Sequence, residues 1–490
     1  MLFTLGKTKE IDIIANMNKY YFTSAIPYVN AAPHIGHAQE FVYSDTIRRF
    51  KKLQGFDVSY LCGSDENGLK IVRAAEEKRT DPQKFTDVNQ EKFLNLAQKL
   101  QVEFSFWQRG TDLNHHKSSQ ELWKLCDKNG DIYKKNYTGL YCVGCEAFYT
   151  KDELDTNGEC FEHPGRKLEK VTEENYFFKL SKYQKFLETL IEKDQLKIIP
   201  YSRKNEALSF IKRGLEDFSI SRSRQRAKNW GVEVPGDRSQ IIYVWFDALN
   251  IYQSGIGFGW DNKLYKSLWP AGLHVIGKGI LRFHAVYWNA ILKSAGLALP
   301  KQLFVHGYLT VNGAKMSKTL GNVIDPLTFI EKFGSDAVRY YLLKEIPSDA
   351  DGDFSEKRFK EIYNADLANG LGNLVARVAK LLEINKVHTG KNDVNKFSEE
   401  VKIKLEDYKF DSALKNIWEK ITKLDRLLQE NKPWEKTGLH QQALWNELTG
   451  GIREITYDLQ PFLPETADKI IKQFEGPEIK SAAPLFPRIK

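Results

Sequence analysis

The sequence is poor in cysteine and methionine, and it contains no long apolar run. Among 490 residues there are five cysteines and three methionines. Lys, Asp or Glu interrupts every hydrophobic stretch before it reaches the 18 or more residues that span a bilayer. So few cysteines fit a reducing compartment better than a disulfide framework. We therefore expect a soluble protein.

The first segment, MLFTLGKTKEIDIIAN, lacks the apolar core of a signal peptide and carries Glu10 and Asp12. These features argue against a secretory or mitochondrial leader, and we expect a cytoplasmic protein. Met17 is an alternative start, so residues 1–16 are interpreted as an N-terminal extension.

The net charge excludes few classes of partner. The 72 basic and 64 acidic residues give a net charge of +8, which permits a polyanionic partner without requiring one. The length favours about three domains. No internal repeat or low-complexity tract is present.

The chain from Lys19 predicts a strand, a helix and a second strand. KYYFTSAI is rich in β-preferring residues, and apolar side chains then recur at helical spacing from Tyr43 to Leu53. Gly55 ends the helix and DVSYLC follows as the next strand. This order is typical of a βαβ unit in a doubly wound parallel sheet.

The α/β alternation breaks off at about Trp107 and resumes after Arg238. Between them lie a cysteine-bearing stretch and a lysine-rich helix near YQKFLETLIEK, which we interpret as an insert. The segments IIYVWF, LHVIG and LFVHGYLTV are then predicted as strands, with a helix from Leu281 to Ser294. The sheet is therefore expected to be assembled from two halves of the sequence.

An all-helical region is predicted after about Asp366. Leu367, Leu371, Leu374 and Val378 form one apolar stripe, and a second stripe runs from Ile417 to Leu428. The predicted division is residues 1–16 (extension), 17–125 (first half of the sheet), 126–238 (insert), 239–312 (second half), 313–365 (lysine loop and following segment) and 366–490 (helical bundle).

Two histidines stand at the expected start of the first helix, in PHIGHAQE. His34 and His37 are three apart, so they share a helix face, and a helix N-terminus attracts anions. Both imidazoles could donate to one phosphate group. Taken alone, the pair is better explained as surface or capping histidines. It is neither a Walker A loop nor a Rossmann glycine fingerprint, and GIGFG at 255–259 is a weak glycine string.

Two lysines follow the strand LFVHGYLTV, in VNGAKMSKTLGN. Lys315 and Lys318 lie in a loop that Gly313 and Gly321 leave mobile, which suits the closing of ammonium groups on a polyphosphate. The alternative is an ordinary solvated lysine loop.

A cysteine cluster with metal-ligand spacing lies in the insert. Cys142-x2-Cys145 and Cys160-x2-His163 supply three thiolates and one imidazole, which would complete a closed tetrahedral zinc site of structural type. Reduced thiols or a redox pair are the alternatives.

PHIGH and KMSK together resemble the two signatures of class I aminoacyl-tRNA synthetases. The segments AIPYVNAAPHIGHAQE, GSDENGLKI, YVWFDAL, HVIGKGILRFHAVYW and DGDFS are similar to the methionyl members of that family, from about Tyr20 to the end. The resemblance implies a Rossmann-like α/β catalytic domain split by a zinc-binding insert and followed by an all-α anticodon-binding bundle.

The resemblance also implies the reaction and its site. Methionine and ATP, with Mg²⁺, would give methionyl-adenylate and pyrophosphate, and the acyl group would pass to tRNA(Met). His34, His37, Lys315 and Lys318 would be catalytic and would bind the ATP phosphates, with Gly277 also at the ATP site. The methionine-binding residues would be Ile26, Tyr28, Asp65, Trp245, Ala248, Leu249, Tyr252, Ile280 and His284.

In the bundle, the matching positions imply that Asn373, Arg377 and Trp434 read the CAU anticodon. Their side chains supply the edge hydrogen bonds and the stacking planes that splayed bases need. As a pattern alone, each is better explained as an ordinary surface polar group or a hydrophobic staple, just as Trp245 and Tyr252 taken singly are better explained as core aromatics.

Three positions depart from the family pattern. Gly279 stands where Asp is usual after GK, Asn67 replaces the common His, and Thr319 replaces Ser. The Gly279 departure concerns how the ATP ribose is held.

The alternatives are another class I specificity and a tRNA-binding paralogue without catalytic activity. Isoleucyl, leucyl and valyl enzymes carry a large editing insert for which 490 residues leave no room. Both histidines and both lysines argue against an inactive paralogue. A monomer is expected, because little chain follows the bundle.

Overall fold

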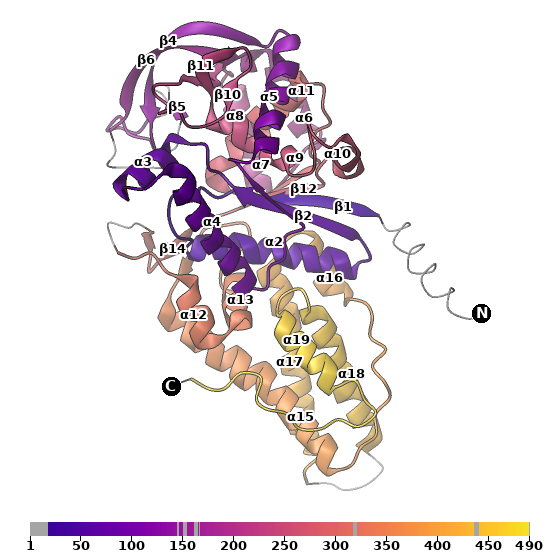
Figure 1. Cartoon of the computed structure of the whole chain (residues 1–490). Coiled ribbons are helices and arrows are strands. Elements are labelled where there is room, and N and C mark those ends of the chain that lie inside the picture. The colour runs from indigo at the N-terminus through magenta and orange to yellow at the C-terminus, as the bar shows by residue number, and fades with distance from the viewer. Residues whose placement is uncertain are drawn as a thin grey trace, which may run out of the picture. The chain divides into compact units, whose positions relative to one another are not determined.

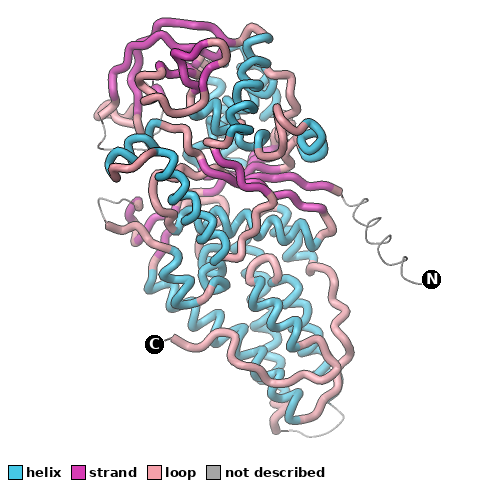
Figure 2. Tube along the Cα trace, viewed as in Figure 1, coloured by secondary structure: helices cyan, strands magenta, loops and turns pink. Residues whose placement is uncertain are grey.

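The computed structural model describes residues 18–144, 147–149, 154–160, 165, 167–316, 321–435 and 441–489. Its contacts divide the chain into two units. The first comprises Met1–Pro33, Phe56–Asn95 and Glu103–His306, and the second comprises His34–Gly55, Leu96–Val102 and Gly307–Lys490. The predicted extension 1–16 lies outside the described residues. Figure 2 shows most strands in the first unit and mainly helices in the second.

A six-stranded parallel sheet organises the first unit (Figure 1). Its central strand β1 pairs in parallel with β2 on one side and with β12 on the other. The strand order therefore reverses beside β1, as in a doubly wound fold, where ligands bind at such a switch point. In spatial order the strands are β3 (Phe106–Arg109), β2 (Asp57–Ser64), β1 (Lys19–Ser24), β12 (Leu273–Gly277), β13 (Gln302–His306) and β7 (Lys197–Ile199).

The predicted fold class is confirmed: this sheet combines strands from both halves of the sequence. KYYFTS packs on both faces, because Tyr21 and Phe22 point to opposite faces and are both buried. The Phe22 ring stacks on Tyr60 with centroids 4.5 Å apart. The helix predicted before Gly55 is α2 (Ile35–Leu53), and Gly55 has a φ of 86°, which favours glycine.

The stretch between the sheet halves forms two antiparallel sheets of its own and contributes the edge strand β7 to the central sheet. The helix predicted at YQKFLETLIEK is present as α6 (Gln184–Glu192). One antiparallel sheet contains β4 (Ile132–Cys142), β5 (Ala147–Tyr149), β6 (Glu169–Phe178) and β8 (Phe218–Ser219), and the other contains β9 (Ser221–Ser223), β10 (Glu233–Val234) and β11 (Asp237–Ile242).

Two predicted strands are wrong in part. In IIYVWF only β11 is a strand, and it is antiparallel; Val244–Leu249 is helix α8, because a short buried apolar run fits either structure. LFVHGYLTV is divided at Gly307, where a Cβ atom would lie 2.1 Å from the carbonyl oxygen of Ala350. The part beyond Gly307 is β14 (Leu309–Val311), which pairs with β15 (Ala314–Lys315) and β16 (Gly352–Phe354).

The helix predicted from Leu281 to Ser294 is present, and it begins with a π-helical turn, η4 (Phe283–Tyr287), before α11 (Trp288–Ser294). The remaining elements before residue 307 are α3 (Leu69–Glu77), α4 (Pro82–Lys99), α5 (Leu113–Lys128), η2 (Leu180–Tyr183), α7 (Tyr201–Lys212), α9 (Ile251–Ser254), α10 (Asn262–Leu268) and η3 (Lys278–Ile280).

The second unit buries the predicted leucine stripes. Leu367, Leu371, Leu374 and Val378 are each at most 1% exposed, which confirms the helical bundle. Its helices are α12 (Pro326–Phe333), α13 (Ser335–Lys344), α14 (Glu356–Ile362), η5 (Tyr363–Gly372), α15 (Asn373–Ile384), α16 (Glu399–Glu406), α17 (Phe410–Asn431), α18 (Gln442–Leu459) and α19 (Pro464–Gln473), in addition to α2. No helix in the described part of the chain is long and apolar enough to cross a membrane.

A buried ion pair ties α2 to the rest of the second unit. Arg339 on α13 lies 2.8 Å from the Asp45 carboxylate on α2, and both side chains are fully buried. The same guanidinium donates to the carbonyl oxygens of Leu100, Pro461 and Phe462. Because these acceptors satisfy the buried charge, Arg339 fixes α2 against the turn that precedes α19.

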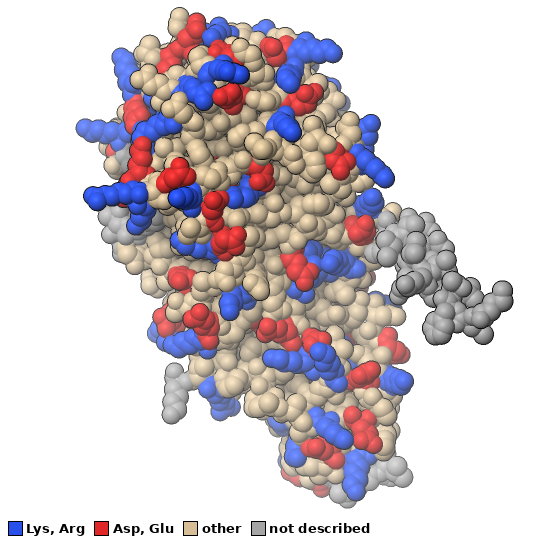
Figure 3. All heavy atoms as spheres, viewed as in Figure 1, with Lys and Arg blue, Asp and Glu red and all other residues tan. Residues whose placement is uncertain are grey.

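Charged side chains of both signs are interspersed on the face drawn in Figure 3. The net charge of +8 is therefore not gathered into one basic surface on that face.

Candidate active site

Aromatic side chains meet in the first unit where α8 approaches η4. Trp245 on α8 stacks on Phe283 with ring centroids 3.8 Å apart and planes 5° apart. Tyr28, just after β1, meets Trp245 edge to face at 6.5 Å. Tyr252 on α9 and His284 on η4 complete what we call the aromatic cluster. Phe283 was not predicted from the sequence, although it is the residue next to His284.

Two residues of this cluster, Tyr252 and His284, hydrogen-bond to each other. The Nδ1 atom of His284 lies 2.9 Å from the carbonyl oxygen of Ile280, which can only accept, so Nδ1 carries the proton. The Nε2 atom must then accept from the Tyr252 hydroxyl, 2.8 Å away. Burial lowers the pKa of His284 to about 4, and the pair is therefore uncharged at neutral pH.

A second buried histidine, which sequence reasoning missed, lies beside this pair. The His274 ring on β12 is 4.6 Å from the Tyr252 ring, and its Nδ1 is 2.6 Å from the hydroxyl of Thr23 on β1. Burial lowers its pKa well below the usual value, and the nearby His284 acts in the same direction. Two neutral imidazoles therefore adjoin the aromatic rings.

The other predicted methionine-binding residues lie on the same elements. Ala248 and Leu249 are buried on α8, and Ile26 and Ile280 pack against the same apolar core. Asp65 follows the last residue of β2 and forms a parallel bridge with Tyr28, while its N–H donates to the carbonyl oxygen of Pro27. Direct contacts thus join Tyr28 to Trp245 and Asp65, and His284 to Tyr252 and Ile280. Ile26, Ala248 and Leu249 share the surrounding apolar core.

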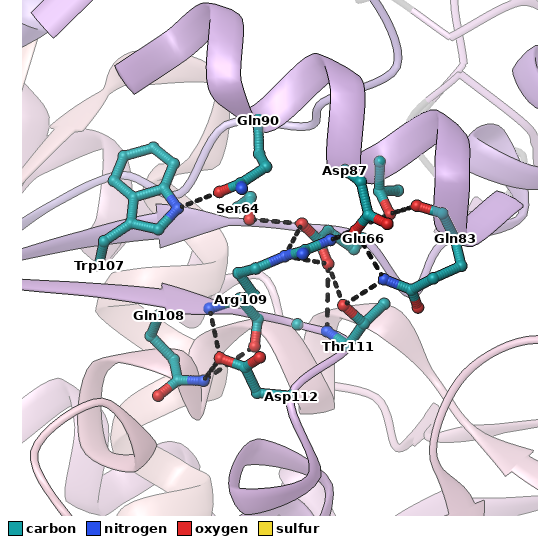
Figure 4. Close-up of polar contacts among 12 residues, drawn as sticks. Ser64, Glu66, Gln83, Asp87, Gln90, Trp107, Gln108, Arg109, Thr111 and Asp112 are labelled. Atoms are coloured by element: carbon teal, nitrogen blue, oxygen red, sulfur yellow. Dashed lines mark hydrogen bonds and ion pairs between the residues drawn. The ribbon is translucent and has the colours of Figure 1, made fainter. Parts of the chain in front are cut away.

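The chain around Asp65 is held by its neighbour Glu66 (Figure 4). The buried Glu66 carboxylate accepts from the Ser64 hydroxyl at 2.7 Å and from Arg109 Nε at 2.9 Å. The N–H and the hydroxyl of Thr111 also donate to it. Arg109 in turn forms an ion pair with Asp87 at 2.7 Å. This network pins the end of β2 to the end of β3, and it was not predicted from the sequence.

Asn67 joins β2 to α8. Its amide nitrogen is 2.7 Å from the carbonyl oxygen of Gly110 and 2.7 Å from the Asp247 carboxylate. Asp247 also accepts from Ser119 and lies 2.9 Å from His115 Nε2. Burial would raise the pKa of Asp247, but His115 and these hydrogen bonds hold it below its usual value.

In the second unit, His34 and His37 cap α2. His34 is the N-cap residue; its Nδ1 accepts from the Gly36 N–H, and His37 Nδ1 accepts from the His34 N–H. Because both Nδ1 atoms accept, the proton of each ring is on Nε2. Burial, reinforced by His34, lowers the pKa of His37 well below its usual value. The helix start therefore carries two imidazoles with Nε2–H donors.

The chain next to KMSK returns to this helix start. A Cβ atom on Gly36 would lie 3.5 Å from the terminal carbon of Met316, and the Ile35 N–H donates to the carbonyl oxygen of Ile324. The Lys315 backbone pairs in β15, but its side chain and all of Lys318 and Thr319 lie outside the described residues.

Gly277 and Gly279 lie at the carboxyl end of β12. Gly277 is the last residue of the strand, and a Cβ atom there would be 3.5 Å from the His306 ring. Gly279 is in the short helix η3 and adds no side chain.

Two of the four predicted zinc ligands are described, and they adjoin. Cys142 Sγ lies 3.2 Å from Cys160 Sγ, and both residues are buried. This separation is too long for a disulfide and is close enough for two thiolates of one metal site. Cys145 and His163 lie outside the described residues. The described residues alone contain no group of three or more such ligands.

The predicted anticodon residues occupy an exposed part of the bundle. Asn373 is exposed at the start of α15, and Trp434, after α17, is 47% exposed. The Arg377 guanidinium lies 5.6 Å from the Trp434 ring and forms an ion pair with Asp425 at 3.0 Å. The structure therefore brings Arg377 and Trp434 together.

Comparison with known proteins finds one family and many relatives. A family model described as "tRNA synthetases class I (M)" matches residues 20–379. The methionine–tRNA ligase of Thermotoga maritima is 40% identical over 478 residues, covering 93% of this chain and 75% of that protein. The corresponding protein of Brucella suis is 37% identical over 506 residues, covering 96% and 98%.

Solved structures agree with these relatives. The methionyl-tRNA synthetase of Mycobacterium tuberculosis in complex with methionyl-adenylate is 36% identical, with a TM-score of 0.89 over 96% of this chain and 100% of that chain. The apo form of that protein gives a TM-score of 0.81 at 34% identity, covering 97% and 99%.

The lowered pKa of His284 predicts a loss of stability in acid. Between pH 6.5 and about 4 the unfolded chain binds a proton at this imidazole that the folded chain does not. Stability from this group is present above pH 6.5 and falls by on the order of 3 kcal/mol as the pH falls through that range. Urea unfolding at several pH values should therefore show a shallower pH slope for His284→Gln. Part of the pH slope should remain in His284→Gln, with the same sign, because burial also lowers the pKa values of His274 and His37.

Trp260→Ala removes an exposed ring and no titratable group, so it provides the control for this measurement and should keep the parent's slope. Parallel curves for the parent and His284→Gln would contradict the assignment of a neutral, buried imidazole.

Proposed function

This chain belongs to the class I tRNA synthetases of the methionyl family, and we propose that its aromatic cluster binds the methionine that it activates. The chain is a methionine–tRNA ligase. It converts L-methionine and ATP to methionyl-adenylate and pyrophosphate, and it then transfers the methionyl group to tRNA(Met) with release of AMP. The alternative specificities and the inactive paralogue are outcomes of the tests below.

The uncharged Tyr252–His284 pair is the observation that carries this assignment. A thioether is apolar and polarizable, and it offers only a weak acceptor. Stacked rings with a neutral hydrogen-bonded pair therefore suit methionine better than an ionic or strongly polar side chain. Ile26, Ala248, Leu249 and Ile280 supply the apolar remainder. Asp65, at the end of β2, is the partner for the α-ammonium group.

The ATP phosphates are assigned to the start of α2. The Nε2–H groups of His34 and His37, together with the first N–H groups of the helix, are neutral donors to an anion. Lys315 and Lys318 add positive charge as pyrophosphate leaves, so the chemistry is positioning and electrostatics, with no covalent enzyme intermediate. Gly277 leaves room for the nucleotide at the end of β12. Mg²⁺ accompanies ATP and neutralises phosphate charge.

Replacing Asp65 by Asn should lower kcat/KM for methionine in ATP–pyrophosphate exchange roughly a hundredfold. The α-ammonium group would lose its charged partner, which costs about 3 kcal/mol. The control is the exposed Asp127→Asn in the same unit, which should behave like the parent.

The same assay decides between the alternatives. A parent without methionine-dependent exchange would be the inactive paralogue. Faster exchange with another amino acid would reassign the specificity.

The bundle is proposed to read the anticodon through Asn373, Arg377 and Trp434. Trp434 exposes its ring, and the adjacent Arg377 guanidinium offers a second stacking and donor plane. Asn373, exposed on the same helix as Arg377, supplies donors and acceptors for a base edge.

Trp434→Ala should therefore reduce tRNA charging about tenfold to a hundredfold, because one stacked base contributes about 1–3 kcal/mol. Methionine-dependent exchange should stay within twofold of the parent, since it needs no tRNA. Trp260→Ala removes a comparably exposed ring from the first unit and serves as the control. An equal loss of charging and exchange in Trp434→Ala would refute the anticodon role.

The adjoining sulfurs of Cys142 and Cys160 fit a tetrahedral zinc site completed by Cys145 and His163. With four protein ligands the ion would stabilise the insert and would leave no position for substrate.

Metal analysis of protein purified without chelators should find about one equivalent of zinc. Cys160→Ser should lose most of it, whereas Cys62→Ser, which changes a buried thiol outside the cluster, should retain it. Zinc well below one equivalent in the parent would contradict the site.

We also propose the domain limits given above, a cytoplasmic location and a monomeric state. None of the four cysteines that the structure describes forms a disulfide, which supports a reducing compartment.

A further inference from the structure

The hairpin of β4 and β5 carries a row of aromatic side chains next to the cysteine cluster. Tyr141 pairs with Phe148, Leu140 pairs with Tyr149, and Cys142 ends β4. The hairpin lies in the insert, whereas the aromatic cluster lies on α8, α9 and η4. Two arginines connect the hairpin with this cluster.

Arg282 is shared between the hairpin and the wall of the cluster. The centre of its guanidinium is 5.0 Å from the Tyr149 ring and 4.9 Å from the Phe283 ring. Phe283 is the ring that stacks on Trp245. A continuous series of contacts therefore runs from Tyr149 through Arg282 and Phe283 to Trp245.

Arg222 makes the second connection, to the beginning of α8. Its guanidinium lies 5.2 Å from Tyr141, 4.7 Å from Phe148 and 4.1 Å from Tyr243. Tyr243 is the N-cap residue of α8, the helix that carries Trp245. The hairpin thus contacts α8 through Arg222 and η4 through Arg282. These are the two elements that carry the stacked rings.

The rings around Arg222 compensate a buried charge. Arg222 is 6% exposed, and its Nη1 donates to the Ser219 hydroxyl and the Ser221 carbonyl oxygen. Its Nε and Nη2 have no hydrogen-bond partner within the described part of the chain. The faces of the three rings therefore stabilise much of the buried Arg222 charge. Moving the hairpin would remove two of these rings from the guanidinium, which is unfavourable.

We propose that the β4–β5 hairpin positions the methionine-binding rings, with Tyr149 and Arg282 as positioning residues that hold Phe283 against Trp245. The inference rests on the proposed function of the aromatic cluster. The Arg282 guanidinium contacts the rings of both Phe283 and Tyr149, and it thereby supports the Phe283 ring, whose plane lies 5° from that of Trp245. The hairpin then governs methionine affinity and leaves ATP affinity unchanged.

The test measures methionine binding by calorimetry without ATP, and KM for methionine and for ATP in the exchange assay. Tyr149→Ala should raise the Kd and KM for methionine about threefold to tenfold, with KM for ATP within twofold of the parent. Tyr149→Phe keeps the ring next to Arg282 and should bind methionine more tightly than Tyr149→Ala does. Tyr133→Ala removes a tyrosine at the other end of β4, where Lys179 covers its ring, and should match the parent.

A double substitution identifies the route of the effect. If Tyr149 acts through Arg282, Tyr149→Ala combined with Arg282→Ala should bind methionine no more weakly than Arg282→Ala alone. Zinc content and thermal unfolding of each variant show whether it has kept its metal and its fold.

Three results would overturn the proposal: unchanged methionine affinity in Tyr149→Ala, methionine and ATP constants that rise together, or additive effects in the double variant. A parent that binds no methionine would refute the proposed function and this inference together. A parent that binds methionine only as tightly as Tyr149→Ala does would refute the role of the hairpin alone.

Discussion

The stack of Trp245 on Phe283 is the contact on which the proposed methionine site depends. The two residues lie on short helical segments, α8 and η4, that follow strands of different sheets. Neither segment is long enough to be stable alone, so tertiary contacts must set the ring planes. Tyr28 contacts one ring edge-on and Arg282 covers the other. Phe283 and His284 are consecutive residues of the π-helical turn η4, so this one segment supplies residues to both the ring stack and the hydrogen-bonded pair.

One physical rule, that the backbone partner of Nδ1 decides which ring nitrogen of a neutral imidazole carries the proton, applies to His284 in the first unit and to His34 and His37 in the second. His284 faces a backbone carbonyl through Nδ1 and therefore accepts at Nε2. His34 and His37 face backbone N–H groups through Nδ1, and the ring proton is therefore on Nε2. One backbone partner thus selects the tautomer of each ring. The tautomer in turn decides whether Nε2 accepts, as it does from Tyr252, or carries an N–H, as it does at the start of α2.

Sequence reasoning predicted the features that depend on local pattern. The strands at 19–24 and 57–64, the helix before Gly55 and the leucine stripes of the bundle follow from periodicity and turn residues. It failed at YVWF, because the period of a short buried run does not separate a helix from a strand. It also missed Glu66 with Arg109, and His274 with Thr23, because these contacts join residues far apart in the chain whose pairing no local pattern encodes.

Asn67 shows how a departure from a family pattern can be self-consistent. The position must satisfy two acceptors, the Gly110 carbonyl oxygen and the Asp247 carboxylate, each 2.7 Å from its amide nitrogen. One primary amide has two N–H donors and needs no charge to serve both. A neutral histidine has a single N–H and would leave one acceptor without a donor from this side chain, whereas a protonated histidine would add a cation beside Asp247. Asn67 therefore joins β2 to α8 without a titrating group of its own, two positions from Asp65.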